Sequence, residues 1–437
     1  FWGYINKTKN QLLQQAKEER SPETIEADDA LYKQISDKLQ DVDLQIPQLS
    51  YVKNATEQIN EELNKLAIHN QEQKVVFDTA STDTDSVINK ISITSKHGDK
   101  KLLIGGEGRL NQIYLSLWAS QNRISEYSNE VSILCVEEPE AYLHPHQQRE
   151  LARYLRGVLN GQVILTSHSP YIVCENSPNS IIRLYKKDQE TLAASNGCSE
   201  IIESGFTDFG YRMSVIPAEA FFADYAILVE GQSELIFYKT LATQIGIDLD
   251  RLNISILSVE GVGFKVYVKI LDALNIEWIA RTDNDINKIK DHEAYRFAGV
   301  ERGLALIEQS FIIGKADQNI ITDNKPKIHG FASKENIPQE VLKAVNELRN
   351  MLVEYNVYVA DVDLETDLCK GPLKVSLKNK YGKDLSDLVG KMKAHKAINM
   401  YDFLQNNKKD LSILKDDYIA MPLWVAKKFV EDKYGTY

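Results

Sequence analysis

The chain has 437 residues, of which 43% are hydrophobic and 26% charged, proportions typical of a folded globular protein. Its net charge of −12 excludes a surface that coats nucleic acid with basic residues throughout, but is compatible with a local basic groove or a bound metal ion. There is no apolar run of about 18 residues and no signal-peptide pattern, so we expect a cytoplasmic protein without a membrane span.

The cysteines are scattered and form no CxxC pair: Cys135, Cys174, Cys198 and Cys369. This pattern is typical of reduced thiols and indicates neither a zinc site nor a disulfide framework. The chain begins at Phe1 and not at Met, inside what we expect to be a domain. We therefore expect that the N-terminal part of this domain is missing from the chain.

The first 74 residues are predicted to be helical. Apolar residues recur at helical spacing between residues 10 and 70, for example Leu31, Ile35 and Leu39. The pattern fits a projecting helical arm or hairpin, and it fits equally well the solvent-facing helices of a larger domain. We assign residues 1–74 to a helical arm.

Two α/β segments follow, because short strands alternate with helices, as in parallel sheets. The first covers residues 75–215, with strands expected at 75–77, 87–93, 131–136 and 163–165 and helices at 111–120 and 147–159. The second covers residues 216–437, with strands expected at 226–229, 254–259, 277–280 and 357–362 and helices at 233–245 and 265–274. Between its last two strands, residues 286–350 are expected to be a helical insertion without strands.

A first group of motifs indicates nucleotide hydrolysis. Glu137 and Glu138 end the apolar strand predicted at 131–136. ATPases use such a pair, since one acid orients the Mg²⁺ ion and its water and the other polarises the attacking water. His168 follows the next strand, and a glycine turn upstream allows the backbone to approach a phosphate. Each motif alone is weak, because an acid at a strand end or a histidine after a strand is more often structural.

In this order, the motifs resemble the second half of the ABC/SMC-type ATPase core, over about residues 85–175. The resemblance implies that the intact protein binds ATP as a regulator or substrate, through Gly105, Gly106, Glu107, Glu137, Glu138 and His168. The chain departs from the pattern in three ways: Glu137 stands in place of the usual Asp, Ile104 in place of a Ser, and no G-x-x-x-x-G-K-[ST] loop occurs.

A second group of motifs indicates a metal site. Three strands predicted in the second segment end in acids, and the carboxyl ends of parallel strands lie at one edge of a sheet. Carboxylates gathered there would repel one another unless divalent cations bound them. We therefore predict two Mg²⁺ or Mn²⁺ ions, which can clamp a phosphodiester, although each acid alone is more often a surface residue. The predicted metal ligands are Glu230, Glu234, Asp283, Asp285, Asp363 and Glu365.

The Glu-Gly-x-Ser-Glu motif at 230–234 and the Asp-x-Asp motif at 283–285 resemble the Toprim domain. An ABC-type ATPase followed by Toprim is the layout of the OLD (overcoming lysogenization defect) family, which includes the nuclease of the Gabija anti-phage system. The resemblance covers roughly residues 75–400. It implies a Mg²⁺-dependent endonuclease acting on double-stranded DNA in antiviral defence. It also implies a homo-oligomer, dimer or tetramer, with the helical arm in dimerisation, and a UvrD-like helicase as partner.

The segment from Lys370 to Asp410 is basic, with ten lysines against four aspartates. Lys391, Lys393 and Lys396 are predicted to contact DNA. The OLD family has a catalytic lysine in this part of the chain, and we favour Lys393, where positive charge would stabilise the transition state. The predicted catalytic residues are Glu230, Asp283, Asp285 and Lys393 for the nuclease and Glu138 and His168 for the ATPase.

Two other interpretations stay open. In the first, the chain is a non-catalytic, SMC-like clamp that ATP opens and closes on DNA, and its acids are structural. In the second, it is a DNA-stimulated ATPase motor. A topoisomerase or a primase is disfavoured, because no recognisable tyrosine-bearing helical domain or zinc module is present.

Overall fold

The structure is a computed structural model that describes residues 2–57, 95–97, 100–102, 133–158, 162–176, 180–187, 190–194, 218–260, 263–382 and 384–435. The chain divides into two compact units, residues 1–147 with 153–166 and residues 148–152 with 167–437. In the described ranges, none of the helices combines the length and the apolar character that crossing a membrane requires.

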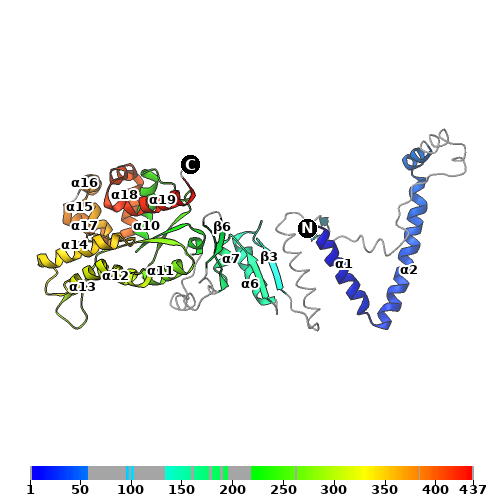
Figure 1. Ribbon diagram of the computed structural model, residues 1–437. Helices are drawn as coiled ribbons and strands as arrows, with labels where there is room; N and C mark the ends of the chain where they lie inside the picture. The colour runs from blue at the N-terminus through cyan, green and yellow to red at the C-terminus, as the bar shows by residue number, and fades with distance from the viewer. Residues whose placement is uncertain are drawn as a thin grey trace. The chain divides into compact units, whose positions relative to one another are not determined.

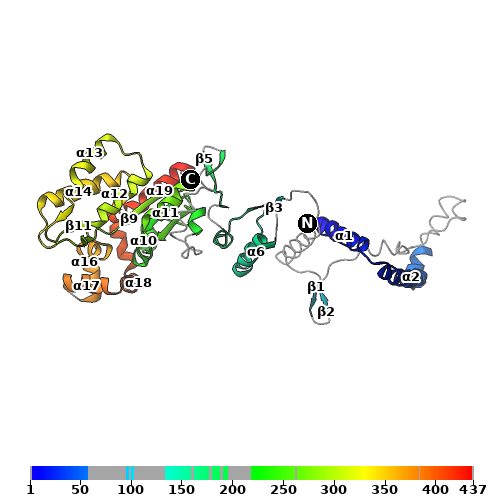
Figure 2. The same ribbon diagram turned by 90° about the horizontal axis from the view of Figure 1, so that it is seen from below.

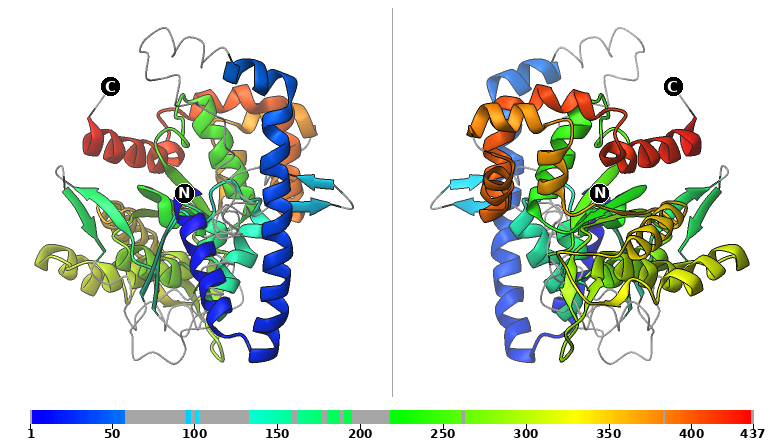
Figure 3. Two further views of the ribbon diagram at one scale, coloured as in Figure 1. Left: turned by 90° about the vertical axis from the view of Figure 1, so that its right-hand side faces the viewer. Right: turned by 90° about the vertical axis from the view of Figure 1, so that its left-hand side faces the viewer.

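The first unit begins with two helices, as the apolar spacing predicts. They are α1 (Trp2–Glu18) and α2 (Pro22–Gln45), and the short 3-10 helix η1 (Ile46–Gln48) follows. The two helices form an open V in Figure 1, and Figure 3 shows the same pair from the side. Ser21 caps α2 at the turn, because its hydroxyl accepts a hydrogen bond from the backbone N–H of Thr24 at 3.4 Å.

The described remainder of the first unit contains strands from the predicted ATPase segment. Strands β3 (Ile133–Glu137) and β4 (Gln162–Thr166) pair in parallel, which confirms both predicted strands. The strands β1 (Ser95–His97) and β2 (Lys100–Leu102) form a small hairpin, visible in Figure 2. Helix α6 (Pro145–Val158) is confirmed as well. The predictions at 75–77, 87–93 and 111–120 lie outside the described residues.

The second unit is built on a four-stranded parallel sheet, so the predicted α/β fold with a parallel sheet is confirmed. In spatial order its strands are β13 (Val357–Val359), β9 (Glu277–Thr282), β7 (Tyr225–Val229) and β8 (Ile254–Ser258). All five residues of β7 are buried. A central strand covered on both faces has a continuous apolar sequence, and this is why its pattern stands out.

Helices cover both faces of this sheet (Figure 1). On one face lie α10 (Gln232–Gln244), α18 (Lys396–Asn407) and α19 (Met421–Tyr434), and on the other α11 (Phe264–Ala273), α12 (Ala298–Ser310) and α14 (Gln339–Val353). Neighbouring residues of β9 point to opposite faces, so that Ile279 packs in one core and Ala280 in the other. The remaining elements of this unit are α7 (Pro170–Val173), β5 (Leu184–Lys187), β6 (Glu190–Ala193), η4 (Ala220–Phe222), α13 (Lys315–Asn324), α15 (Leu364–Lys370), α16 (Lys374–Tyr381), α17 (Leu385–Ala394), η5 (Lys408–Leu414) and η6 (Tyr418–Ala420).

The prediction that residues 286–350 lack strands is wrong. Three short strands form an antiparallel sheet there: β10 (Ile286–Lys288), β11 (Tyr295–Phe297) and β12 (His329–Phe331). Each has only three residues, too few to show the alternation that identifies a strand in a sequence. The helices of this stretch form one cover of the sheet: Gly303 of α12 lies so close to Leu352 and Val357 that an added Cβ would come within 2.8 Å of Leu352.

Strand β13 is shorter than predicted, because it ends at Val359 and not at Val362. The backbone N–H groups of Asp361 and Val362 donate to the carboxylate of Asp367, at 3.0 and 3.1 Å, and not to a neighbouring strand. The chain therefore leaves the sheet early and turns towards α15. This turn brings Asp363 to the edge at which the other strands end.

Candidate functional site

Three neighbouring strand ends bring acidic residues together, as the sequence predicts. Glu230 follows β7, Asp283 and Asp285 follow β9, and Asp363 follows β13. The backbone N–H of Asp283 donates to Oε1 of Glu230 at 2.9 Å, which ties the first two strand ends together. The backbone N–H of Leu364 donates to Oδ1 of Asp283 at 3.3 Å and ties in the third. These acids therefore form one acidic cluster at the carboxyl edge of the sheet.

Glu234 lies beneath this cluster and has a structural position. It is only 4% exposed, and its Oε2 accepts backbone hydrogen bonds from Glu230 and Gly231, at 2.6 and 3.1 Å. Its Oε1 pairs with Arg281. Burial raises the pKa of its carboxyl to about 7, against the attraction of Arg281. Both oxygens are therefore engaged in holding the turn between β7 and α10, and the geometry does not support the predicted role of Glu234 as a metal ligand.

Arg281 joins Glu234 to the acidic cluster and was not singled out by the sequence analysis. Its Nη1 pairs with Glu234 and with Oδ1 of Asp283, the latter at 3.1 Å. Burial alone would lower the pKa of this guanidinium, but the negative charges of Glu234 and Asp283 and the proximity of Tyr238 keep it raised. Arg281 therefore stays charged under the cluster and shares its one positive charge between Glu234 and Asp283.

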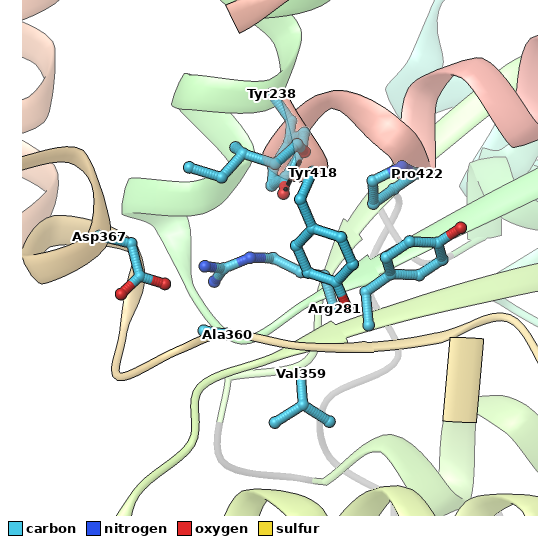
Figure 4. A pocket seen from close by; sticks show the side chains of 9 residues that line it. Tyr238, Arg281, Val359, Ala360, Asp367, Tyr418 and Pro422 are labelled. Carbon is cyan, nitrogen blue, oxygen red and sulfur yellow. Dashed lines mark hydrogen bonds between the residues drawn. The ribbon is translucent and has the colours of Figure 1, made fainter. Parts of the chain in front are cut away.

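A small cavity lies beside Arg281 (Figure 4). Its lining includes Asp367, Tyr238 and Tyr418, and its volume of about 10 Å³ is close to the space that one water molecule needs. Nη2 of Arg281 is buried and has no hydrogen-bond partner within the described part of the chain. Burial raises the pKa of Asp367 to about 6. The cavity is too small for a nucleotide and suits a buried water on the free guanidinium nitrogen.

A second arginine, Arg302, approaches the cluster from α12. Its Nη1 pairs with Oε1 of Glu230 and with the hydroxyl of Thr282, and its Nη2 lies 3.8 Å from Oδ2 of Asp285. The guanidinium carbon lies 5.9 Å from the centre of the Phe264 ring, within the range of a cation–π contact. Arg302 is 30% exposed, so this cation stands between two acids at the solvent-facing side of the cluster.

A glycine allows α12 to come this close. A Cβ added to Gly299 would lie 2.1 Å from the carbonyl oxygen of Asp283 and 2.7 Å from Cα of Asn284. The backbone N–H of Ala298 donates to the carbonyl of Asp285 at 2.8 Å, so α12 begins on the Asp-x-Asp loop itself. Arg302 lies one turn further along the helix, which places its side chain at Glu230.

Two of the predicted lysines also reach the cluster. Nζ of Lys393 lies 2.6 Å from Oδ2 of Asp363, and Nζ of Lys396 lies 3.1 Å from Glu365 and 3.4 Å from Asp283. Burial alone would raise the pKa of Asp363, but hydrogen bonds from Lys393 and Thr366 hold it below its usual value. Burial alone would lower the pKa of Lys396, whereas Glu365 and Asp283 raise it.

The third predicted lysine is not brought to the acids. The side chain of Lys391 is exposed, and its backbone carbonyl accepts a hydrogen bond from Asn399 at 2.7 Å. Glu365 is buried, and its Oε1 accepts a hydrogen bond from the Ser233 hydroxyl at 2.7 Å. All the predicted nuclease residues except Lys391 therefore lie at or beside the acidic cluster. Glu234 supports the cluster from below.

The predicted ATPase acids end β3. Glu137 is its last residue, and the backbone N–H of Glu138 donates to the carbonyl of Thr166 at 3.0 Å. Glu138 has a φ of 42°, in the left-handed region that residues other than glycine seldom adopt. Such strain is typical of functional positions. His168 follows β4 by two residues, while Gly105, Gly106 and Glu107 lie outside the described residues.

The donors of the acidic cluster fit a hard divalent cation. They are carboxylate oxygens, which Mg²⁺ prefers, and Asp285 is 50% exposed and can turn towards an ion. In the described part of the chain, Oε2 of Glu230 takes part in no hydrogen bond. As the side chains stand, no three acidic, histidine or cysteine side chains of the described residues are arranged to hold an ion. Arginine and lysine side chains occupy the positions between the acids.

Comparison with known proteins agrees with both groups of motifs. A family described as "Overcoming lysogenization defect protein-like, TOPRIM domain" matches residues 221–285, and an AAA ATPase domain family matches residues 3–173. The chain is 24% identical to endonuclease GajA of Bacillus cereus strain VD045 over 388 residues, which are 87% of this chain and 64% of that protein. It is 27% identical to the OLD nuclease of Thermus scotoductus over 191 residues, 41% of this chain and 35% of that protein.

Among similar solved structures is the C-terminal region of the Burkholderia pseudomallei OLD protein, with 21% identity and a TM-score of 0.30. The alignment covers 48% of this chain and 99% of that one. The chain spans less than two thirds of the two curated relatives named above. The Toprim match begins before β7 and ends at Asp285, so it includes the strand ends that carry Glu230, Asp283 and Asp285.

Proposed function

Because this chain is an OLD-family protein that joins an AAA ATPase domain to an OLD-like Toprim domain, we propose that it is a nucleotide-regulated DNA endonuclease. The proposed reaction is hydrolysis of phosphodiester bonds in double-stranded DNA with Mg²⁺ or Mn²⁺ at the acidic cluster. The observation that carries the proposal is the convergence of Glu230, Asp283 and Asp363 from three parallel strands at one edge.

The proposed metal ligands are Glu230, Asp283, Asp285, Asp363 and Glu365. Divalent ions, two in this proposal, would neutralise the phosphate charge and lower the pKa of a bound water. Lys393 and Lys396 present their ammonium groups at the same edge, each 43–44% exposed. There they would attract the DNA backbone, and Lys393 would stabilise negative charge that develops on the phosphate.

Cleavage of supercoiled plasmid by the purified full-length protein tests the proposal. We expect nicking or linearisation with Mg²⁺, none with EDTA, and none for Glu230→Ala in either condition. Glu340→Ala, at an exposed position in the first turn of α14, is the matched control and should cut like the wild type. Cutting by Glu230→Ala at the wild-type rate would refute the assignment of the reaction to this cluster.

Variants of the Asp-x-Asp loop distinguish the proposed nuclease from a non-catalytic DNA clamp. In a clamp, the acids are structural, and replacing Asp283 and Asp285 together by Asn would leave DNA binding and any cutting unchanged. In a nuclease, the double variant binds DNA but does not cut it. A DNA-stimulated motor would instead show fast ATP turnover that DNA accelerates.

The remaining features of the proposal rest on the resemblance to the OLD family. We infer that ATP regulates cutting or is hydrolysed during it, and that the intact protein is a homo-oligomer, dimer or tetramer. We also infer a cytoplasmic role in anti-phage defence, as for the Gabija nuclease, with a UvrD-like helicase as partner. Sedimentation of the purified full-length protein measures the oligomer size directly, and a monomer would contradict that inference.

A further inference from the structure

Arg302 occupies a position that the proposed metal site needs. Its guanidinium pairs with Glu230 and Thr282 and lies 3.8 Å from Asp285, so it bridges the ends of β7 and β9. These two strand ends carry the most accessible proposed ligands: the side chains of Glu230 and Asp285 are 27% and 50% exposed. A cation that approaches Glu230 or Asp285 from solvent therefore finds Arg302 beside these carboxylates.

We propose that Arg302 is the built-in counter-ion of the metal-free site, that it competes with a divalent ion for Glu230, and that the ion displaces it on binding. The inference rests on the proposed function, because it concerns the same acidic cluster. In this proposal Arg302, a residue of α12, helps to set the metal affinity of the site, whereas the metal ligands follow the strands of the sheet. Arg302 is therefore a positioning residue, since it acts through Glu230 and Asp285.

The electrostatic argument is direct. Acids gathered at one edge repel one another, and in the metal-free protein a fixed cation relieves that repulsion. The same cation repels an incoming divalent ion and competes for the oxygens that the ion needs. Two like charges a few ångströms apart near a protein surface repel each other. The energy of this repulsion is larger than the free energy that corresponds to a tenfold change in affinity. Removing the charge at position 302 should therefore tighten metal binding.

The local structure allows the displacement. Arg302 is 30% exposed, and its long side chain is bound by Glu230 and Thr282 at one end and stacked on Phe264. Arg281, by contrast, is 3% exposed and is enclosed by Glu234 and Asp283. Of these two arginines, Arg302 is the one that can turn to solvent without opening the core.

Binding of Mn²⁺ to the full-length protein without nucleotide, followed by electron paramagnetic resonance of the free ion, tests this inference. Sites are assigned to the cluster if they disappear in Glu230→Gln. We expect Arg302→Met to bind Mn²⁺ at these sites about tenfold more tightly than the wild type, and Arg302→Lys to lie between them. The control Arg296→Met, which removes another arginine with an acidic partner from the same stretch, should match the wild type.

The outcomes distinguish failure of the inference about Arg302 from failure of the proposed metal site. Wild-type affinity or weaker binding in both Arg302→Met and Arg302→Lys would refute the role of Arg302 and leave the metal site intact. Absence of Glu230-dependent Mn²⁺ binding in the wild type and every variant would refute the metal site and, with it, the counter-ion. If Arg302→Met does not fold by circular dichroism, Arg302→Lys decides alone, because its shorter side chain should still give tighter binding.

Discussion

Arg281 shows how one buried cation supports the candidate site. It shares its charge between Glu234 and Asp283, which are 4% exposed each. Removing one member of a buried ion pair leaves an uncompensated charge, which typically costs about 3–5 kcal/mol. We therefore expect Arg281→Met to lower the free energy of unfolding of the second compact unit by several kcal/mol in urea titrations. Arg281→Lys should lose less, because it keeps the charge.

A surface arginine provides the control for this prediction. Arg296 pairs with Glu301 and is 40% exposed, and such pairs contribute at most about 1 kcal/mol. Arg296→Met should therefore change the unfolding free energy little. Equal losses in Arg281→Met and Arg296→Met would mean that Arg281 is not the cation on which the buried acids depend.

The acids of the site could be predicted from sequence, whereas their cationic partners could not. Glu230, Asp283 and Asp363 follow apolar strands, and the carboxyl ends of parallel strands share an edge. Arg281 lies within a strand and gives no signal of its own. Arg302 lies 72 residues after Glu230, in a stretch that resembles an insertion, and only the folded chain brings the two together.

The start of α12 is the element on which the position of Arg302 depends. A methyl group at Gly299 would meet the backbone of Asp283 and Asn284, and backbone atoms cannot move aside as a flexible side chain can. We expect Gly299→Ala to push α12 away from the Asp-x-Asp loop, at a cost of about 1–3 kcal/mol in stability, and to reduce cleavage strongly. Plasmid cleavage and thermal melting measure the two effects.

A second glycine gives a matched comparison for Gly299. Gly314 precedes α13 and has an ordinary backbone conformation, and its Cβ would meet only Oδ2 of Asp317, at 3.9 Å. Gly314→Ala should therefore cut DNA like the wild type. If Gly299→Ala cuts as fast as Gly314→Ala, the close approach of α12 to the loop has no functional importance.

The last helix is tied to the sheet by one carboxylate, which predicts a pH dependence. Asp224, just before β7, accepts hydrogen bonds from Lys433 at 2.7 Å, Tyr434 at 2.9 Å and Asn253 at 3.0 Å. Burial alone would raise the pKa of Asp224, but these donors hold it below its ordinary value. Its stabilising contribution is therefore present above the unfolded pKa of about 3.9 and is lost as the pH falls through the lower folded value.

Asp224→Asn tests this connection between α19 and the sheet. At pH 7 the variant should be less stable by about 1.5–3 kcal/mol, the range for hydrogen bonds to a charged group. Below about pH 4, the wild type should lose stability more steeply than the variant, because only the wild type has this carboxyl to protonate. Parallel stability curves for the two proteins between pH 7 and pH 3 would contradict the assignment.

At the level of elements, long apolar strands were predictable and short polar ones were not. β7 and β8 each contain five residues that are buried or nearly so, and their apolar runs identify them. β10, β11 and β12 have three residues each, and they are held by pairing with one another. β13 was predicted too long, because Asp367 takes the backbone N–H groups that would have continued it.

Across the whole molecule, a segment that we assigned by sequence to the ATPase part belongs to the second compact unit. Arg183, just before β5, donates hydrogen bonds to four backbone carbonyls: those of Phe221 at 3.0 Å, Ala223 at 2.7 Å, Leu274 at 3.2 Å and Asn275 at 2.9 Å. Arg183 is 9% exposed. The order of the motifs along the chain predicts the order of the domains. This connection could not be predicted, because it depends on Arg183, which belongs to no motif. The segment that follows the proposed ATPase residues is thus fixed to the unit that contains the acidic cluster.

This connection motivates a prediction about control by nucleotide. If Glu138 polarises the attacking water, Glu138→Gln slows ATP hydrolysis and prolongs the nucleotide-bound state. Whatever ATP does to DNA cutting in the full-length protein, activation or inhibition, the effect should be larger and last longer in Glu138→Gln. Plasmid cleavage over time, with and without ATP, measures it.

Glu190→Gln, at an exposed position of β6, is the control and should respond to ATP like the wild type. A Glu138→Gln protein that cuts equally fast with and without saturating ATP would show that the two sites act independently, and the proposal of nucleotide regulation would fail.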